Sequence, residues 1–298
     1  MVVALLAVTG CVASSVSAFG VFLPVLSEAF GWSRGAISVA LSINMFWGGL
    51  AAFAISGVVD RRGPRGVLAV TVLAGGVGFA LTACVSELWH FYLTYGMLVG
   101  LGMSSIYVLT SATVSRWFDL GRGLALAVVL SGFNLGWLVG GPLAAFLIGR
   151  WGWRTAYVVL GVVVILVGVP ASLCVRYPAA RASSGAGGVA SASRSARATF
   201  RDALADPRLW YLVSSWGLLG LVFMMVSVHS VSYGKDRGLP LEQASLILTA
   251  FGIGAAAGRL LAGAASDRFG VSLTMRWCVL VQGAALLILV AGPPSWAL

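Results

Sequence analysis

The chain has 298 residues, of which 59% are hydrophobic and 9% are charged, and its formal net charge is +10. A soluble domain carries roughly 25% charged residues, so this composition excludes an ordinary soluble globular protein. The positive charge does not indicate nucleic-acid binding, because the arginines are dispersed over many short polar segments and form no basic patch.

Long apolar runs follow one another along the chain, and a run of about 20 residues is enough for a helix to cross a bilayer. We therefore predict an all-α, multi-pass membrane protein that lies in the lipid bilayer. The first run is too long and lacks the positive flank of a cleavable signal peptide, so we interpret it as a retained helix. The nine predicted spans are residues 2–26, 36–59, 67–86, 90–113, 123–148, 155–175, 209–230, 244–266 and 275–291.

The segments between the spans indicate an orientation. With the N-terminus in the cytoplasm, thirteen Lys and Arg residues fall in inner segments and five in outer ones, and Arg259 completes the total of 19. This bias predicts a protein of the cell membrane, plasma or inner, with a cytoplasmic N-terminus. The longest segment, 176–208, is rich in Ser, Ala, Gly and Arg and is typical of a flexible cytoplasmic linker. It divides the chain into a six-helix bundle at 1–175 and an incomplete C-terminal bundle at 209–298.

An internal repeat supports this division. Asp60-Arg61-Arg62-Gly63 follows the second span, and Asp267-Arg268-Phe269-Gly270 follows the eighth. Each half therefore has the sequence Asp-Arg-x-Gly in an inner turn after its second helix. Two bundles related by a parallel repeat are one of the designs found in membrane transporters.

These turns resemble the inner-loop motif of the major facilitator superfamily, Gly-x-Leu-Ala-Asp-Arg-x-Gly-Arg-Lys. The matching residues are Asp60, Arg61, Gly63 and Arg65 in the first copy, and Gly263, Asp267, Arg268 and Gly270 in the second. The first copy departs at Ser56, where the motif has Gly, and the second lacks the final basic residue. The resemblance implies the major facilitator fold and a gating role for the charged residues, which latch one access state on the cytoplasmic face. The alternative is a solvated turn that only sets topology.

Three stretches are similar to the branch that contains monocarboxylate transporters and oxalate/formate antiporters. They are Phe30–Arg34, Arg116–Ala125 and His229–Gly238. The family has twelve helices, so a chain with nine spans is expected to be a fragment or a truncated reading frame. The resemblance implies secondary transport of a small organic anion and no cofactor. No enzyme constellation is present in the sequence.

Arg259 is the only charged residue in the span 244–266. A cation at the bilayer centre costs about 2.5–3.5 kcal/mol on insertion scales, so a retained one indicates function. In the resembled branch an arginine on the eighth helix binds the substrate carboxylate, for which a guanidinium offers a matching planar fork of donors. The alternative is an arginine that snorkels or contacts backbone carbonyls.

Two departures from the family leave the coupling open between a proton and a counter-anion. Animal proton-coupled carriers have Asp one turn before this arginine, where this chain has Ala255, and they have Lys on the first helix, where it has Ser17–Gly20. Oxalate/formate exchangers use a second cation on an eleventh helix, which this chain does not contain.

Four further polar residues are candidates for substrate binding. Tyr107, Asn44 and Asn134 lie in the middle of spans, where they are expected either to line a cavity or to join helices by hydrogen bonds. His229 lies near the outer end of its span, where it either titrates near a cavity or faces the lipid headgroups. A pattern of small residues typical of close helix packing, with an antiport signature as the alternative, is formed in the fifth span by Gly132, Gly136, Gly140, Gly141 and Pro142.

The sequence therefore predicts a secondary carrier of small, monocarboxylate-like anions. Two alternatives stay open: a carrier of another solute, such as a drug or a sugar, and a truncated membrane protein that transports nothing.

Overall fold

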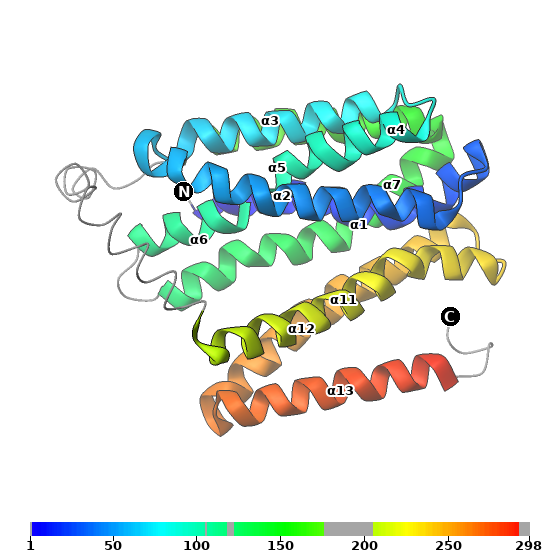
Figure 1. The fold of residues 1–298 in the computed structure, drawn as a ribbon. Coiled ribbons are helices and arrows are strands. Elements are labelled where there is room, and N and C mark those ends of the chain that lie inside the picture. Colours follow the sequence, from blue (N-terminus) through cyan, green and yellow to red (C-terminus); the bar gives the residue numbers. More distant parts are fainter. Residues whose placement is uncertain (1, 105, 118–121, 176–204, 292–298) are drawn as a thin grey trace.

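The computed structural model describes residues 2–104, 106–117, 122–175 and 205–291, which form helices joined by short turns (Figure 1). The first bundle begins with three helices: α1 (Val2–Phe30), α2 (Arg34–Arg62) and α3 (Pro64–Thr82). A fourth, segmented helix follows as α4 (Leu88–Phe91), the π-helical η1 (Tyr92–Val99), α5 (Gly100–Ser104) and α6 (Ile106–Trp117). The bundle ends with α7 (Arg122–Val163), the π-helical η2 (Val164–Gly168) and α8 (Val169–Leu173). The later helices are α11 (Pro207–Asp236), α12 (Leu241–Phe269) and α13 (Val271–Ala291).

Each of the nine predicted spans coincides with helical structure. Six helical stretches in the described residues are long and apolar enough to cross a membrane. One of them, Val128–Leu173, contains the fifth and sixth predicted spans, which are bent against each other at Gly152 with a φ of 81°. The fourth span is not among these six, and α13 is missing because its apolar stretch, Ser272–Ile288, is too short.

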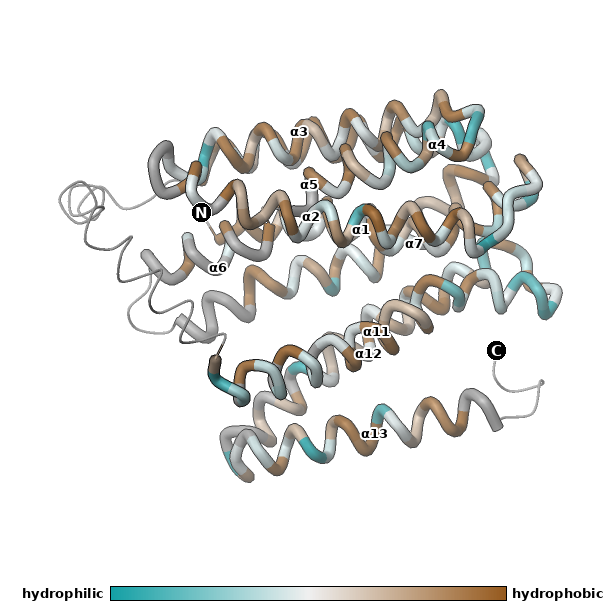
Figure 2. The backbone as a smooth tube through the Cα atoms, in the orientation of Figure 1, coloured by the Kyte–Doolittle hydropathy of each residue, from teal (hydrophilic) through white to brown (hydrophobic). Residues whose placement is uncertain are grey.

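The ends of the helices differ from the predicted boundaries. α1 continues to Phe30 and α11 to Asp236, beyond the predicted ends at residues 26 and 230. Hydropathy detects only the part of a helix in hydrocarbon, whereas backbone hydrogen bonding continues into the polar interface. Hydrophilic residues accordingly gather mainly near the ends of the helices, and hydrophobic residues fill their middles (Figure 2).

The first bundle depends on close contact between α1 and α7. A methyl group added at Gly132, Gly136 or Gly140 would lie 2.6–2.7 Å from backbone atoms of α1. Side-chain hydrogen bonds join the same two helices, since Thr9 donates to the Val129 carbonyl at 2.9 Å and Ser17 to the Gly136 carbonyl at 3.1 Å. The predicted packing role of these glycines is therefore confirmed.

Aromatic side chains fill another part of the first bundle. Phe22 stacks on Tyr157 with ring centroids 3.8 Å apart, and Phe79 packs edge-on against Tyr95 at 5.8 Å. All four rings are buried. They connect α1, α3, η1 and α7 into one core.

The second bundle is smaller and more exposed. α11 packs on α1, α12 packs on both α7 and α11, and α13 packs on α12 at the edge of the molecule (Figure 1). The linker predicted at 176–208 lies almost entirely outside the described residues, so the division into these domains stays a prediction.

The two Asp-Arg-x-Gly turns have the same backbone geometry. Gly63 joins α2 to α3 with a φ of 79°, and Gly270 joins α12 to α13 with a φ of 84°. Gly270 follows Gly63 by 207 residues, and Gly238 (φ 88°) follows Gly31 (φ 69°) by the same number. Because only glycine adopts such positive φ values at little cost, the internal repeat is present in the backbone as well as in the sequence.

We predict that Gly136→Ala destabilises the protein by about 1–3 kcal/mol, because the added methyl group overpacks the contact with α1. Gly217→Ala is the matched control, since a methyl group at Gly217 meets no atom within 4 Å. Thermal unfolding of the purified proteins in detergent measures both effects. Equal unfolding temperatures for the two variants would contradict the role given to the α1–α7 contact.

Candidate functional site

The two bundles meet along two pairs of helices. In the pair α1 and α11, a methyl group at Gly20 would lie 3.1 Å from the Val228 carbonyl oxygen. In the pair α7 and α12, Thr249 donates to the Leu138 carbonyl at 3.3 Å, and a methyl group at Gly252 would lie 2.9 Å from the Leu138 nitrogen. Both pairs are therefore in backbone contact.

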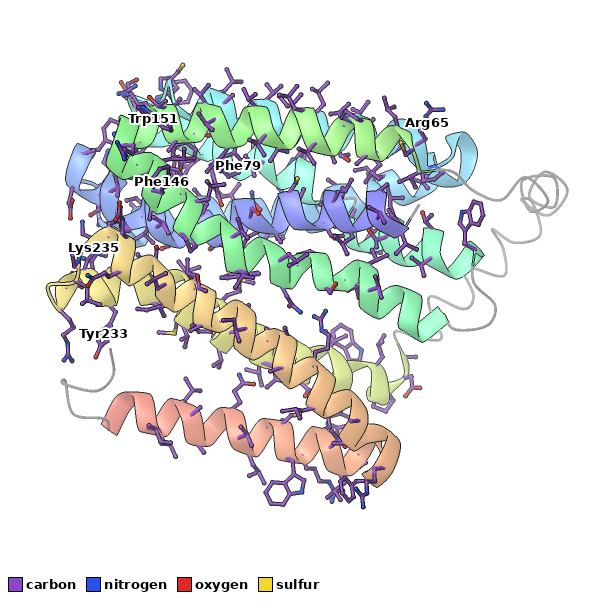
Figure 3. All side chains as sticks on the ribbon, turned by 180° about the vertical axis from the view of Figure 1, so that it is seen from behind. Arg65, Phe79, Phe146, Trp151, Tyr233 and Lys235 are labelled. Carbon is purple, nitrogen blue, oxygen red and sulfur yellow. The ribbon has the colours of Figure 1, made fainter. Side chains whose placement is uncertain are left out.

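These contacts lie toward one end of the molecule. Figure 3 shows Lys235 and Trp151 at this end and Arg65 at the opposite end, so we call them the Lys235 end and the Arg65 end. α11 and α12 lie close to the first bundle at the Lys235 end and diverge from it toward the Arg65 end (Figure 1).

Arg259 lies on α12 where the bundles have separated. It follows Gly252 by seven residues, which is two turns and about 10 Å of helix, so the two residues share a face. Leu248, which packs against Gly141 of α7, lies on that face as well. Arg259 is exposed and makes no ion pair with any described residue. Its cation is therefore on the side of α12 that faces the first bundle, two turns beyond the Gly252 contact.

Asn134 lies on the opposite side of the same interface. Its carbonyl oxygen would lie 3.2 Å from a methyl group at Gly252, and its side chain is half-buried. Asn134, Leu138 and Gly141 form one stripe of α7 that contacts α12. The structure thus brings Asn134 to the interface that also carries Arg259, with two turns of α12 between their levels.

Asn44 is in a different environment. Its side chain is 1% exposed and donates to the Tyr95 carbonyl at 2.9 Å, between α2 and η1 inside the first bundle. Its Oδ1 atom has no hydrogen-bond partner among the described residues. This position fits the alternative role of joining helices, rather than lining a cavity between the bundles.

The structure does not bring His229 to Arg259, and it does not describe the Tyr107 side chain. The neighbours of His229 that pack on the rest of the protein, Val228 and Val231, are buried, whereas His229 itself is exposed. This favours the interpretation of a histidine that faces its surroundings. Tyr107 belongs to α6, and its side chain lies outside the part that the structure describes.

The residues of the gating motif lie at the Arg65 end or at its turns. Arg65 is exposed there, and the guanidinium of Arg268 lies over the Phe269 ring at 5.6 Å. The side chains of Asp60, Arg61 and Asp267 are not among those described, so the gating role of these residues stays a prediction.

Sequence reasoning did not predict two ion pairs at the Lys235 end, although Arg34 and Asp236 belong to stretches that carry the resemblance. Lys235 of α11 contacts Glu28 of α1 at 2.6 Å. The guanidinium of Arg34, at the start of α2, donates from both terminal nitrogens to the two carboxylate oxygens of Asp236, each at 2.6 Å. The internal repeat could have drawn attention to the first pair. Lys235 follows Glu28 by the same 207 residues that separate the turn glycines, so two residues of opposite charge occupy equivalent positions in the two bundles.

Two repeated bundles of helices with apolar middles and hydrophilic ends define a multi-pass helical membrane protein. The chain belongs to the Major Facilitator Superfamily, whose family model matches residues 5–298. The structure is similar to the crystal structure of a D-xylose-proton symporter, with a TM-score of 0.64 over 90% of this chain and 69% of that chain. At 15% sequence identity this similarity shows the fold alone.

Similar sequences include carriers from distant organisms. An uncharacterized 38 kDa protein of Thermoproteus tenax is 31% identical over 271 residues, which is 90% of this chain and 66% of that protein. Monocarboxylate transporter 11 of Homo sapiens is 26% identical over 90% of this chain and 56% of its own length. Monocarboxylate transporter 4 of Rattus norvegicus is also 26% identical, over 82% of this chain and 52% of its own length. The chain thus spans between about half and two thirds of these relatives.

The different environments of two asparagines lead to a prediction. Asn44→Ala is expected to lower the free energy of unfolding by about 1 kcal/mol, because it removes a buried hydrogen bond between helices. Asn134 is half-buried at the interface, so Asn134→Ala is expected to change the free energy of unfolding by no more than about 0.5 kcal/mol. Denaturant or thermal unfolding in detergent measures both variants, and an equal loss in the two would contradict the distinction.

Proposed function

We propose that this protein carries small, monocarboxylate-like organic anions across a cell membrane by alternating access between its two bundles. The observation that carries this proposal is the position of Arg259. It is the lone charge of its span and lies on the face of α12 that contacts the first bundle, two turns beyond the contact at Gly252.

The chemistry of the guanidinium supports an anionic substrate. Arginine stays protonated under all physiological conditions and presents a planar fork of donors that matches a carboxylate. In a site of low dielectric this attraction is strong and also orients the bound anion. Two similar proteins are monocarboxylate transporters by name, which supports the same class of solute.

Asn134 is the second residue that we propose for the substrate site. Its amide adds donors and an acceptor on α7, opposite the face of α12 that carries Arg259. Ala255 stands one turn before Arg259, so a carboxylate–arginine proton relay at this place is not part of the proposal. The coupled partner is a proton or a counter-anion bound elsewhere.

We also propose that the Arg65 end faces the cytoplasm, together with the N-terminus. The excess of arginine in the segments predicted to be inner supports this orientation. The Asp60–Arg65 and Asp267–Gly270 turns then lie on the cytoplasmic side, where the proposed gating role is to stabilise one access state through charges at helix ends.

Arg259→Ala is expected to lower carboxylate uptake by about ten- to hundredfold, because it removes a charge-assisted hydrogen bond from the substrate. Uptake of labelled short-chain monocarboxylates into proteoliposomes measures this loss at equal amounts of inserted protein. Arg276→Ala is the matched control, since Arg276 is an exposed arginine at the Arg65 side of α13 and is expected to be dispensable.

Undiminished uptake by Arg259→Ala would overturn the proposal. Competition separates the two alternative functions: excess carboxylate inhibits uptake by an anion carrier, whereas a neutral sugar or a drug inhibits uptake only by a carrier of that solute. A protein that transports nothing would show no uptake with any of them.

A further inference from the structure

The Lys235 end is closed by two ion pairs that cross from one bundle to the other. Glu28 and Arg34 flank the turn between α1 and α2, and Lys235 and Asp236 end α11. The pairs Glu28–Lys235 and Arg34–Asp236 each have nitrogen–oxygen distances of 2.6 Å, and the second pair is bidentate. A bidentate pair is stronger and more directional than a single contact between charges.

The first pair joins equivalent positions of the internal repeat. Lys235 follows Glu28 by 207 residues, the interval that also relates Gly63 to Gly270. Gly20 and Ser227 are separated by the same interval and are also in contact, since a methyl group at Gly20 would lie 3.3 Å from the Ser227 carbonyl oxygen. Residues that meet their own repeat equivalents lie on the axis that relates the two bundles. α1 and α11 therefore meet on this axis at two levels, eight residues or about 12 Å apart.

Motion that opens the Lys235 end must separate these two helices. The ion pairs are farther toward that end than the Gly20 contact, so they are the first interactions that such a motion breaks. The four charged side chains are 22–67% exposed. Water weakens each pair to a modest bias, which makes the contact breakable in every cycle.

We propose that Glu28, Arg34, Lys235 and Asp236 form a charge clasp that holds the Lys235 ends of the bundles together and opens when solute enters or leaves at that end. This inference rests on the proposed alternating access, but not on the identity of the solute. The clasp stabilises the arrangement seen here, in which the bundles touch at the Lys235 end and diverge toward the Arg65 end.

The test measures access to the axis from the Lys235 side. Ser227 is buried against Gly20, so Ser227→Cys provides a reporter in a chain whose four native cysteines are replaced by alanine. A membrane-impermeant maleimide added on the Lys235 side labels this cysteine only when that end opens. The isosteric double variant Glu28→Gln with Asp236→Asn removes both ion pairs. A second double variant, Glu28→Lys with Lys235→Glu, exchanges the two charges of the first pair and keeps their attraction.

Breaking the clasp is expected to raise the initial labelling rate about three- to tenfold, as two weak ion pairs allow. Glu28→Lys alone is expected to raise it as well, because three cations then meet, and adding Lys235→Glu returns the rate to within about twofold of the parent. Glu87→Gln is the control for a charge change at the same end, because Glu87 bonds Trp89 of its own turn at 2.9 Å.

Two results would overturn the clasp: an unchanged labelling rate after Glu28→Gln with Asp236→Asn, or no restoration by the exchanged pair. Restoration by the exchange also excludes misfolding of the single variant as the cause. The labelling needs no substrate, so it distinguishes failure of the clasp from failure of the proposed anion transport, which only the uptake by Arg259→Ala decides.

Discussion

The close contact of α1 with α7 is the interaction on which the rest of the structure depends. Lipid gives helices no hydrophobic reason to associate, so their contacts rely on van der Waals packing and on hydrogen bonds between them. Gly132, Gly136 and Gly140 let the two backbones approach until Ser17 and Thr9 reach carbonyl groups of α7. The same helix presents Asn134, Leu138 and Gly141 to α12 on another face. α7 therefore connects both bundles and sets the orientation of the helix that carries Arg259.

Much of this fold was predictable because its causes are local. Hydropathy located all nine spans, and two short motifs indicated the turns at Gly63 and Gly270, where the backbone needs a positive φ. The break between the fifth and sixth spans was predicted and falls at Gly152, whereas the π-helical turns of η1 and η2 were not predicted. These features depend on how a helix fits its neighbours, and hydropathy along a single span contains no information about that fit.

The candidate site was predictable in part. Arg259 is conspicuous in the sequence because it is charged in an apolar span, but its direction depends on which face of α12 packs against α7. Asn44 and Asn134 are equivalent in the sequence, as both are asparagines in the middle of a span. Burial separates them, because Asn44 bonds Tyr95 inside one bundle and Asn134 lies between bundles. Single-residue chemistry cannot make this distinction without the packing partners.

The contact between Glu28 and Lys235 also has a consequence for assembly. The two positions are equivalent in the repeat, yet they carry opposite charges that attract each other across the axis. If two copies of the first half met about the same axis, two Glu28 carboxylates would face each other and repel, and two copies of the second half would oppose Lys235 to Lys235. Divergence at one repeated position thus favours the pairing of unlike halves. It selects against symmetric self-association of either half while the chain is being made.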